Sequence, residues 1–539
     1  MFKFLSPALL LACLWAILIG VGLAIRPLFP IDETRYAAVA WEMWVRNDFL
    51  VPRLNGEAYS HKPPLLFWLM QLTWWLFGVN DWSLRLIAPL FSLATLYLSG
   101  AVAKQLWPDP NQVAELAPVV LLGFFFWMVF SSLIMFDIML SFFVLLSIYV
   151  LLTLARSGLS VKRWALLGLA LGGGALSKGP VIFLHVLPVA LLAPWWLVSQ
   201  KRDYSWQHWY GGLILAALMG AIIVFCWAIP AGIKGGEAYR NSIFLRQTLG
   251  RLVDSFSHKQ PSWWYLQWLP IMLLPWVLMK PFWTGLAKLD VQDFGVRVCL
   301  AWAVPVFVAF SLVSGKRIHY LLPLMPALAL MLARAVDNGA SFNWRCAYMW
   351  VMIAYGFLGL VLLMSPWLSG FYGWQVVLST DSSKWGIILM LCAASLGVLT
   401  PNNSGNSVFY VCLGSIIAAL VIAGGFFQAK GERYDTVPPA QKIAELMAEK
   451  RAIAFYGGKY YGQFHFTGRL TQPITMVLNR KDLEGFVTQH PAGYVLVEYD
   501  DSKGLPESML SYHFPYKTLN IGFISSKNLV DNPGLRSML

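Results

Sequence analysis

The chain has 539 residues, of which 58% are hydrophobic and 15% aromatic, and its mean hydropathy is +0.60. Repeated long apolar segments of this kind are typical of helices surrounded by lipid, which excludes an ordinary soluble protein. The formal net charge is +13 without a basic low-complexity tail, so basic cytoplasmic loops and an anionic lipid ligand explain the charge better than nucleic-acid binding does.

The N-terminal segment predicts an uncleaved first membrane span. Lys3 precedes an apolar run that continues to Ile25, and no small-residue cleavage site stands before Arg26. With about 20 apolar residues per span, we count about thirteen spans. Their centres lie near residues 16, 93, 124, 146, 170, 189, 220, 274, 306, 326, 355, 392 and 418. The fifth is short and rich in glycine, which predicts a broken or tilted helix.

Basic residues fall mainly on one side of these spans, which the positive-inside rule assigns to the cytoplasm. With an odd number of spans, the polar segments that are energetically unfavourable beside the apolar spans all lie on the external side. There we expect them to converge on one cavity. The alternative is that they are ordinary external loops. These segments are the 26–82 loop, Asp137, Lys178, the 231–262 loop, residues 315–320 and the polar tail.

The first external loop is unusually rich in charge for a chain in which only 12% of residues are charged. Asp32 and Glu33 begin a predicted amphipathic helix, whose apolar stripe includes Tyr36 and which would lie along the membrane surface. Adjacent carboxylates can simply favour a helix N-terminus, and for Glu33 that reading is as good as a functional one. For Asp32 we favour a function. Arg35, one turn on, can pair with a carboxylate or hold a phosphate.

The end of the same loop places His61 and Lys62 before two prolines and an apolar run. The prolines stiffen the entry and hold Lys62 at head-group depth. Lysines there often only extend toward the interface, but a point-charge contact to phosphate is the reading we favour. Tyr59 adds an aromatic hydroxyl beside Lys62.

Further polar groups lie at the external ends of later spans. Asp137 is an acid in a strongly apolar stretch, which is a functional hypothesis by default. His258 and Lys259 precede an aromatic-rich boundary that could be only an interfacial belt. A short turn between two spans contains Lys316, Arg317, His319 and Tyr320. Orientation rules do not explain cations in an external turn, so we expect an anion, such as a lipid phosphate, to compensate them.

Residues from about 431 onward change in composition. Three runs are strand-like, RAIAFYG, GYVLVEYD and LNIGFISS, and they alternate with two helix-like ones, AQKIAELMAEK and the stretch after Asn479. This pattern predicts a small external α/β domain over residues 431–539. Its His465 and His513 are isolated, and we interpret them as surface or capping residues. The six cysteines all lie in apolar segments, which argues against a disulfide framework. The predicted fold is therefore a mainly α integral membrane bundle over residues 1–430 followed by this domain.

The carboxylates and cations of these external segments indicate sugar transfer from a polyprenyl phosphate. The carboxylates would lie near the reacting sugar, and the cations would surround the phosphate that leaves. The leaving phosphate gains negative charge, which fixed Lys and Arg side chains stabilise. A transporter would instead place polar groups at mid-span within internal repeats, and no clear repeat is present. A structural membrane protein, whose loops would be dispensable, is the third reading.

Several segments resemble the bacterial aminoarabinose transferase family, which modifies lipid A and is related to protein O-mannosyltransferases within the GT-C glycosyltransferases. They are DETRYA, NDFLVPRLNGEAYSHKPPLLFW, the Asp137 loop, HKQPSWWYL and SGKRIHYLLPLMPAL. The resemblance implies a thirteen-span inner-membrane protein with a periplasmic domain and an undecaprenyl phosphate–sugar donor. It covers nearly all of residues 1–430 and is weak over the tail.

The resemblance also implies roles for individual residues. Asp32 and Asp137 look like the essential carboxylates, and Arg35, Lys62 and Tyr320 look like donor-phosphate or cavity residues. His258 matches a position in a metal-associated site of the family. At the position before Lys62 the family usually has glutamate, but this chain has His61. Two histidines can still hold zinc.

The acceptor decides the role of Asp32. A lipid A phosphate is ionised and needs no base, so Asp32 would orient the acceptor or an amine on the sugar. A hydroxyl acceptor, as in a protein or pilin glycosyltransferase of the same fold, would need Asp32 as general base. Direct attack from the face opposite the leaving phosphate gives inversion at the sugar carbon.

Overall fold

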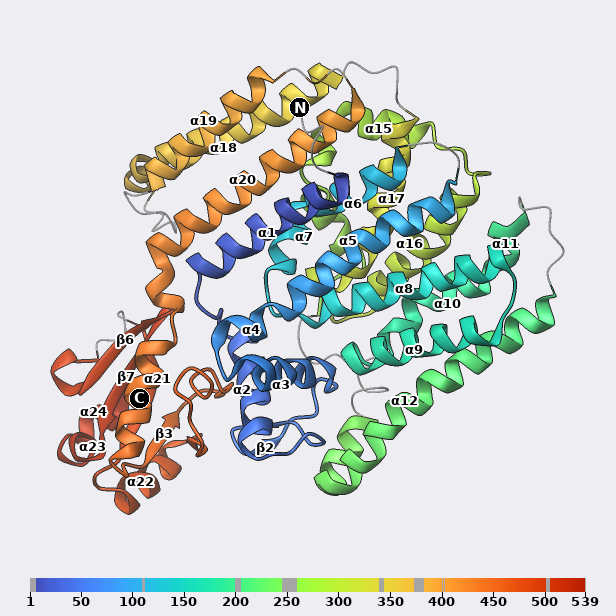
Figure 1. Cartoon of the computed structure of the whole chain (residues 1–539). Coiled ribbons are helices and arrows are strands. Elements are labelled where there is room, and N and C mark those ends of the chain that lie inside the picture. The colour runs from blue at the N-terminus through green and yellow to red at the C-terminus, as the bar shows by residue number, and fades with distance from the viewer. Residues whose placement is uncertain are drawn as a thin grey trace. The chain divides into compact units, whose positions relative to one another are not determined.

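Helices make up most of the chain in the computed structural model (Figure 1), as the apolar composition predicts. The structure describes residues 6–108, 112–198, 205–244, 259–338, 344–372, 382–399, 401, 403–500 and 505–538. Contacts divide the chain into two units. The helical unit comprises Met1–Ala24, Ser60–Leu66 and Arg85–Gly425, and the loop–sheet unit comprises Ile25–Tyr59, Phe67–Leu84 and Phe426–Leu539.

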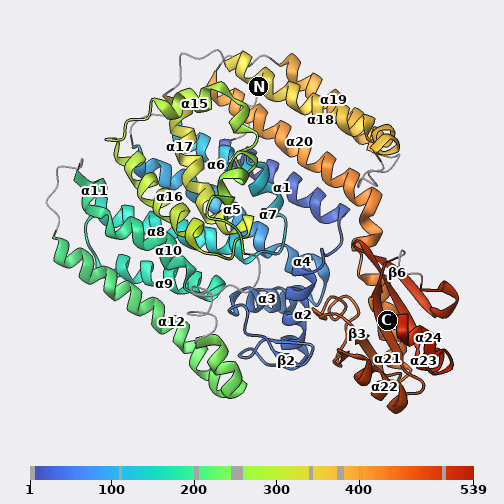
Figure 2. The ribbon, with the colours of Figure 1, turned by 180° about the vertical axis from the view of Figure 1, so that it is seen from behind.

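The helical unit is built from long apolar helices and short connecting ones. Figure 2 shows the same elements from behind, including the adjacent pair α18 and α19. The helices of this unit are α1 (Pro7–Ile25), α5 (Ile87–Leu106), α6 (Val113–Gly123), α7 (Phe125–Ser131), α8 (Phe136–Ser157), α9 (Val161–Lys178), α10 (Val181–Leu191), α11 (Ala193–Leu197), α12 (Trp206–Asn241), α14 (Trp264–Met272), η3 (Trp276–Leu278), α15 (Lys280–Ala287), α16 (Phe294–Leu312), η4 (Ile318–Leu324), α17 (Met325–Asp337), α18 (Trp344–Tyr372), α19 (Ser382–Val398) and most of α20 (Ser404–Lys430).

The structure confirms a multi-span membrane fold but not the count of thirteen spans. Within the described ranges, eight helices are long and apolar enough to cross a membrane, or nine if α6 and α7, bent by 69°, form one span. Three shorter apolar helices, Leu65–Phe77, Val181–Leu191 and Ser383–Val398, fall below that length. The predicted span near residue 274 is divided among α14, η3 and α15, where prolines interrupt the helical hydrogen bonds.

Of the two predictions for the glycine-rich fifth span, the broken helix is wrong, and the tilted helix stays a prediction. Residues Val161–Lys178 form one continuous helix, α9. Its glycines instead allow close packing against α12, because a Cβ at Gly168 would lie 2.7 Å from the Met219 Cβ and one at Gly172 would lie 2.8 Å from the Ile223 Cδ1. Small residues at helix contacts commonly serve this purpose in membranes.

The loop–sheet unit combines the first loop with the C-terminal domain. The first loop supplies helices and a short antiparallel hairpin: α2 (Asp32–Val45), β1 (Arg53–Leu54), β2 (Glu57–Ala58), most of α3 (Leu65–Phe77) and α4 (Asp81–Arg85). The remaining elements are η5 (Gly431–Tyr434), α21 (Val437–Ala448), β3 (Ile453–Tyr456), β4 (Thr475–Val477), α22 (Arg480–Gln489), β5 (Tyr494–Tyr499), η7 (Glu507–Met509), β6 (Tyr512–Tyr516), β7 (Leu519–Ser525), α23 (Ser526–Asp531) and α24 (Pro533–Met538).

A five-stranded mixed sheet with the order β4-β3-β5-β7-β6 forms the C-terminal domain. Successive side chains along its strands point to opposite faces and enter two cores. Phe455 and Leu496 pack with α21 on one face, and Ala454 and Val495 pack with α22 on the other. The predicted strands β3, β5 and β7 and both predicted helices are present. The edge strands β4 and β6 were missed because β4 has only three residues and β6 contains Pro515, which sheets tolerate at an edge.

The cysteine prediction agrees with the structure. All six cysteines are free thiols.

Candidate functional site

A buried ion pair joins two helix ends in the helical unit. Asp137 lies in the first turn of α8 and Lys178 in the last turn of α9. The Lys178 ammonium donates to the Asp137 carboxylate, and their side chains are 9% and 2% exposed. Each charge also suits the helix end that carries it, since helix dipoles favour anions at the N-terminus and cations at the C-terminus. The fold thus stabilises a charge pair where apolar sequence surrounds it.

Three further predicted residues surround this ion pair. The Lys62 ammonium lies 5.3 Å from the ring centre of Phe136, and the Lys178 ammonium lies 4.6 Å from that of Tyr320. Asp137 interacts electrostatically with Lys178, His319 and Lys62. We call Asp137, Lys178, Lys62, His319 and Tyr320 the Asp137 group. It contains two lysines and one carboxylate, so it has excess positive charge suited to an anion.

The segment that leads into η4 is held by backbone pairing. Lys259 and Gly315 form an antiparallel bridge, and the Gln260 amide donates to the Ser314 carbonyl at 3.0 Å. The buried Lys316 ammonium donates to the carbonyls of Val313 and, at 3.0 Å, Gln260. Lys316 therefore holds the turn together, and its predicted phosphate role stays a prediction.

Arg317 contributes its backbone to the same region. Its carbonyl accepts a hydrogen bond from the Tyr265 hydroxyl at 3.1 Å. This contact ties α14 to the start of η4. The predicted phosphate role of the Arg317 guanidinium stays a prediction.

A second charged group lies in the loop–sheet unit. Asp32 and Arg35, one turn apart on α2, form an ion pair, and the Arg35 guanidinium carbon lies 5.4 Å from the ring centre of Tyr36. Burial lowers the pKa of Arg35, but its interactions with Tyr59, Tyr36 and Asp32 outweigh burial and raise the pKa above its ordinary value. Burial also raises the pKa of Tyr36. The group therefore presents a permanent cation beside a neutral phenol.

The neighbouring carboxylate has a different environment. Glu33 is 2% exposed, forms an ion pair with Arg26 and accepts a hydrogen bond from the Phe29 amide at 2.8 Å. It therefore ties the start of α2 to the preceding segment. The structure assigns Glu33 a structural contact, which leaves Asp32 as the more exposed acid of the two.

The described residues do not test the predicted metal site. His61 is exposed, and His258 lies outside the described residues. Among the residues that are described, no group of three His, Cys, Asp or Glu side chains could hold a metal ion. A zinc site at His61 and His258 stays a prediction.

Sequence reasoning placed Lys178 on the external side without assigning it a role, and it did not include Tyr461 at all. Lys178 is the direct partner of Asp137, and the rule that intramembrane charges pair with one another would have found it. Tyr461 in the C-terminal domain lies with its ring centre 5.6 Å from the Arg35 guanidinium, and nothing in the sequence marks it. The Asp137 and Asp32 groups lie in different units, so one shared cavity stays a prediction.

His185 on α10 is a buried polar residue near the Asp137 group. It is 0% exposed, packs 5.6 Å from the ring centre of Phe310, and interacts electrostatically with Lys178 and Asp137. Neither ring nitrogen has a hydrogen-bond partner among the described residues. Buried polar groups without partners are destabilising.

We expect His185→Leu to raise the free energy of unfolding by about 1–3 kcal/mol, because it removes polar atoms that burial leaves without partners. Thermal denaturation of the purified protein in detergent measures the change. The exposed His513→Leu serves as a control and should leave the midpoint unchanged. A lower midpoint for His185→Leu would mean that His185 has a stabilising polar contact.

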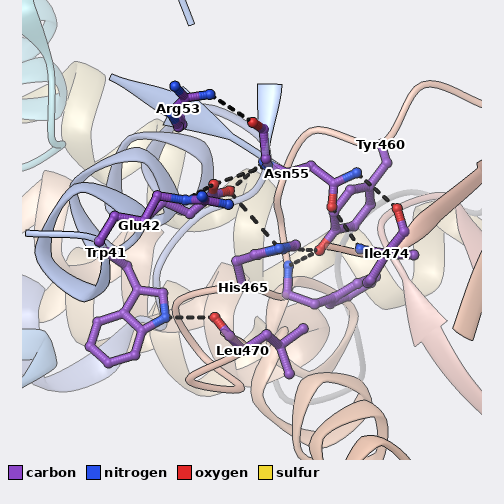
Figure 3. A network of polar contacts seen from close by, with 11 residues as sticks. Trp41, Glu42, Arg53, Asn55, Tyr460, His465, Leu470 and Ile474 are labelled. Atoms are coloured by element: carbon purple, nitrogen blue, oxygen red, sulfur yellow. Dashed lines mark hydrogen bonds and ion pairs between the residues drawn. The ribbon is translucent and has the colours of Figure 1, made fainter. Parts of the chain in front are cut away.

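The interpretation of His465 as a surface or capping residue is wrong. It is 1% exposed and lies in a network between α2 and the C-terminal domain (Figure 3). Its Nδ1 lies 2.8 Å from the Tyr460 hydroxyl, which itself accepts from the Phe464 amide. If the phenol donates to Nδ1, the Nε2 proton points toward Glu42, whose Oε1 lies 4.0 Å away. In the sequence His465 stands between Phe464 and Phe466, and no local pattern indicates its contact with Glu42.

His465 makes the stability of the loop–sheet unit depend on pH. Burial lowers its pKa from 6.5 to about 4. The unfolded imidazole therefore takes up a proton at a higher pH than the folded one, so the unfolded state is favoured increasingly as pH falls through this window. The loss amounts to about 3 kcal/mol once both forms are protonated. Burial raises the pKa of Glu42, which has the opposite effect.

We expect His465→Gln to weaken the loss of stability on acidification, because Gln has no proton to gain. Thermal midpoints of both proteins at pH 7 and pH 5 measure this difference, and Glu42 is present in both. The wild-type midpoint should fall more between these values. Equal falls would show that the folded imidazole takes up its proton as readily as the unfolded one.

The architecture and the placement of charges define a class of protein. A multi-span helical unit together with a small α/β domain is the fold that the GT-C resemblance predicts, and the charged pair at two helix ends is added by the structure. Residues 61–227 match the model of the dolichyl-phosphate-mannose-protein mannosyltransferase family. The match covers part of the chain only, within the first half of its sequence.

Curated relatives and solved structures make the relationship more specific. The chain is 29% identical over 370 residues to the undecaprenyl phosphate-alpha-4-amino-4-deoxy-L-arabinose arabinosyl transferase of Edwardsiella ictaluri, covering 66% of this chain and 65% of that protein. It is 28% identical over 420 residues to the transferase of the same name from an Enterobacter species, covering 75% and 73%. The first of these matches thus spans slightly less than two thirds of the relative.

The fold is that of ArnT from Cupriavidus metallidurans. The crystal structures bound to undecaprenyl phosphate and in the apo state each match with a TM-score of 0.74 over 96% of this chain and 97% of theirs, at 20% and 19% identity. The fold class is confirmed. The recognition of aminoarabinose transferases as homologues is also confirmed, since the curated relatives carry that name.

Proposed function

We propose that this chain is a membrane glycosyltransferase that moves 4-amino-4-deoxy-L-arabinose from undecaprenyl phosphate to a periplasmic acceptor, the phosphate of lipid A. The names of the curated relatives support the sugar and the donor. The basic-residue pattern supports a place in the bacterial inner membrane with the reacting groups on the periplasmic side.

The observation that carries the proposal is the buried Asp137–Lys178 ion pair with Lys62 beside it. A charge pair at helix ends in an apolar unit needs a reason to be retained, because replacing such pairs by apolar residues is often neutral or stabilising. Binding a lipid phosphate is such a reason. Two fixed ammonium groups offset the phosphate charge, and Asp137 keeps one of them oriented.

In the proposed reaction, an oxygen of the acceptor forms a bond to the first carbon of the sugar. The bond from that carbon to the phosphate oxygen of the donor breaks, and its electron pair leaves with undecaprenyl phosphate. Lys62 and Lys178 stabilise the negative charge that grows on the leaving phosphate. Attack opposite the leaving group inverts the configuration at the sugar carbon.

Asp32 and Arg35 have a role that depends on the acceptor. Because the lipid A phosphate is already ionised, Asp32 does not act as a base in the proposed reaction but orients Arg35 and the substrate. With a hydroxyl acceptor, Asp32 would take the proton. A protein or pilin O-glycosyltransferase using a polyprenyl-phosphate sugar is therefore the second candidate, and a lipid-linked substrate transporter is a weaker third.

Mass spectrometry of lipid A and of surface proteins from cells with and without this chain tests the proposal. We expect lipid A to carry aminoarabinose only when the chain is present. Unchanged lipid A together with a sugar on pilin or another surface protein would favour the second candidate. Modification of neither, with altered distribution of a lipid-linked sugar, would favour transport.

A further inference from the structure

A segment of the C-terminal domain, residues 457–463, is held against α2 within the loop–sheet unit. Gly462 has a φ of +73°, a backbone conformation that glycine adopts easily. A Cβ at this position would lie 2.5 Å from the Leu54 Cδ1 and 3.1 Å from the Ala38 Cβ. Glycine therefore allows the segment to approach α2 and the β1–β2 hairpin closely.

Hydrogen bonds fix the chain that follows this segment (Figure 3). The Trp41 indole donates to the Leu470 carbonyl at 2.8 Å. The Asn55 side chain donates to the Ile474 carbonyl at 2.9 Å and accepts from the Ile474 amide at 2.8 Å, as a neighbouring strand would. Together with the buried His465, these contacts give the C-terminal domain a defined position on α2.

Tyr461 is placed over the Arg35 guanidinium as a consequence. The ring centres of Tyr36 and Tyr461 lie 5.4 and 5.6 Å from the guanidinium carbon, within the range of cation–π attraction. The Lys459 ammonium lies 5.7 Å from the same Tyr461 ring centre. Arg35 also pairs with Asp32, yet its Nε has no hydrogen-bond partner among the described residues.

We propose that Lys459 and Tyr461 complete, with Arg35, a binding site for the phosphate group of a lipid substrate. Two cations share one aromatic ring, and among the described residues Asp32 is the one carboxylate that forms an ion pair with Arg35, so the site has a net positive charge. Lys459 is exposed. Tyr461 is a positioning residue that restricts Arg35. The inference rests on the proposed function and gives the C-terminal domain a direct part in substrate binding.

The phosphate belongs either to the undecaprenyl donor or to the acceptor, and steady-state kinetics separate the two. The KM for undecaprenyl phosphate-aminoarabinose and the KM for lipid A are measured in detergent for wild type, Lys459→Gln and Tyr461→Leu. We expect each variant to raise one of the two KM values by about 2- to 30-fold while kcat stays close to wild type. The substrate whose KM rises is the one that this site binds.

Conservative and matched variants separate binding from general damage. Tyr461→Phe keeps the aromatic ring and should remain near wild type. Lys442→Gln removes another lysine–tyrosine contact of the same domain, in which the Lys442 ammonium lies 4.1 Å from the Tyr512 ring centre, and should change neither KM. Thermal midpoints of all variants confirm that they fold.

Two results would overturn the inference. The first is an active wild type whose two KM values are unchanged in both Lys459→Gln and Tyr461→Leu. The second concerns a wild type that transfers no aminoarabinose, which would reject the proposed function by itself. In that case, tryptophan fluorescence measures the binding of undecaprenyl phosphate and of lipid A to wild type and the same variants. Equal affinities for all of these proteins would reject the phosphate site as well.

Discussion

Asp137→Asn is expected to lower kcat for aminoarabinose transfer by about 10²- to 10³-fold, as the loss of a preorganised electrostatic group does in other enzymes. Without its carboxylate partner, the Lys178 ammonium is no longer held in place beside the leaving phosphate. The same change leaves a buried charge uncompensated, which destabilises by about 3–5 kcal/mol. Transfer to lipid A in proteoliposomes and thermal denaturation measure the two effects.

A charge-neutral double variant separates these two effects. Asp137→Asn combined with Lys178→Gln removes both charges, so we expect it to recover most of the lost stability without recovering transfer. Recovery of activity along with stability would show that the ion pair only supports folding. In that case the Asp137 group would not be part of the reacting site.

Asp32→Asn is expected to lower kcat by about 10²-fold, because Arg35 loses the partner that fixes its position and small displacements of a positioning group have effects of this size. With lipid A phosphate as acceptor, the pH profile of the remaining activity should match that of wild type, since no base is needed. The measurement is kcat against pH for both proteins with the same acceptor.

A matched control uses another ion pair of the same unit. Arg469 pairs with Asp81 at 2.9 Å, and both side chains are well exposed. Asp81→Asn should therefore leave transfer unchanged, since exposed pairs contribute little.

The pH profile of Asp32→Asn would contradict this account if it lost the alkaline plateau of kcat instead of decreasing uniformly. That result would identify Asp32 as a general base and favour a hydroxyl acceptor.

Much of the architecture follows from the sequence because lipid leaves few choices for a chain. Apolar runs of span length predict membrane helices, and rare charges at their ends predict pairing. Asp137 was found for this reason, and its partner Lys178 follows the same rule. The change in composition near residue 431 likewise predicts the sheet domain, whose three central strands were identified correctly.

Other features depend on packing that no local pattern contains. The glycines of α9 look like a break but provide a close contact with α12. His465 looks isolated in sequence, yet its partners Tyr460 and Glu42 come from two different parts of the chain. The contact of Tyr461 with Arg35 joins residues far apart in sequence, and a single sequence gives no sign of it.

Reconstitution tests the central claim most directly. Purified protein in proteoliposomes receives undecaprenyl phosphate-aminoarabinose and lipid A, and mass spectrometry follows both lipids over time. We predict that lipid A gains one aminoarabinose on a phosphate while an equal amount of undecaprenyl phosphate is released. Unchanged lipid A and intact donor, with protein that is folded and correctly inserted, would contradict the account.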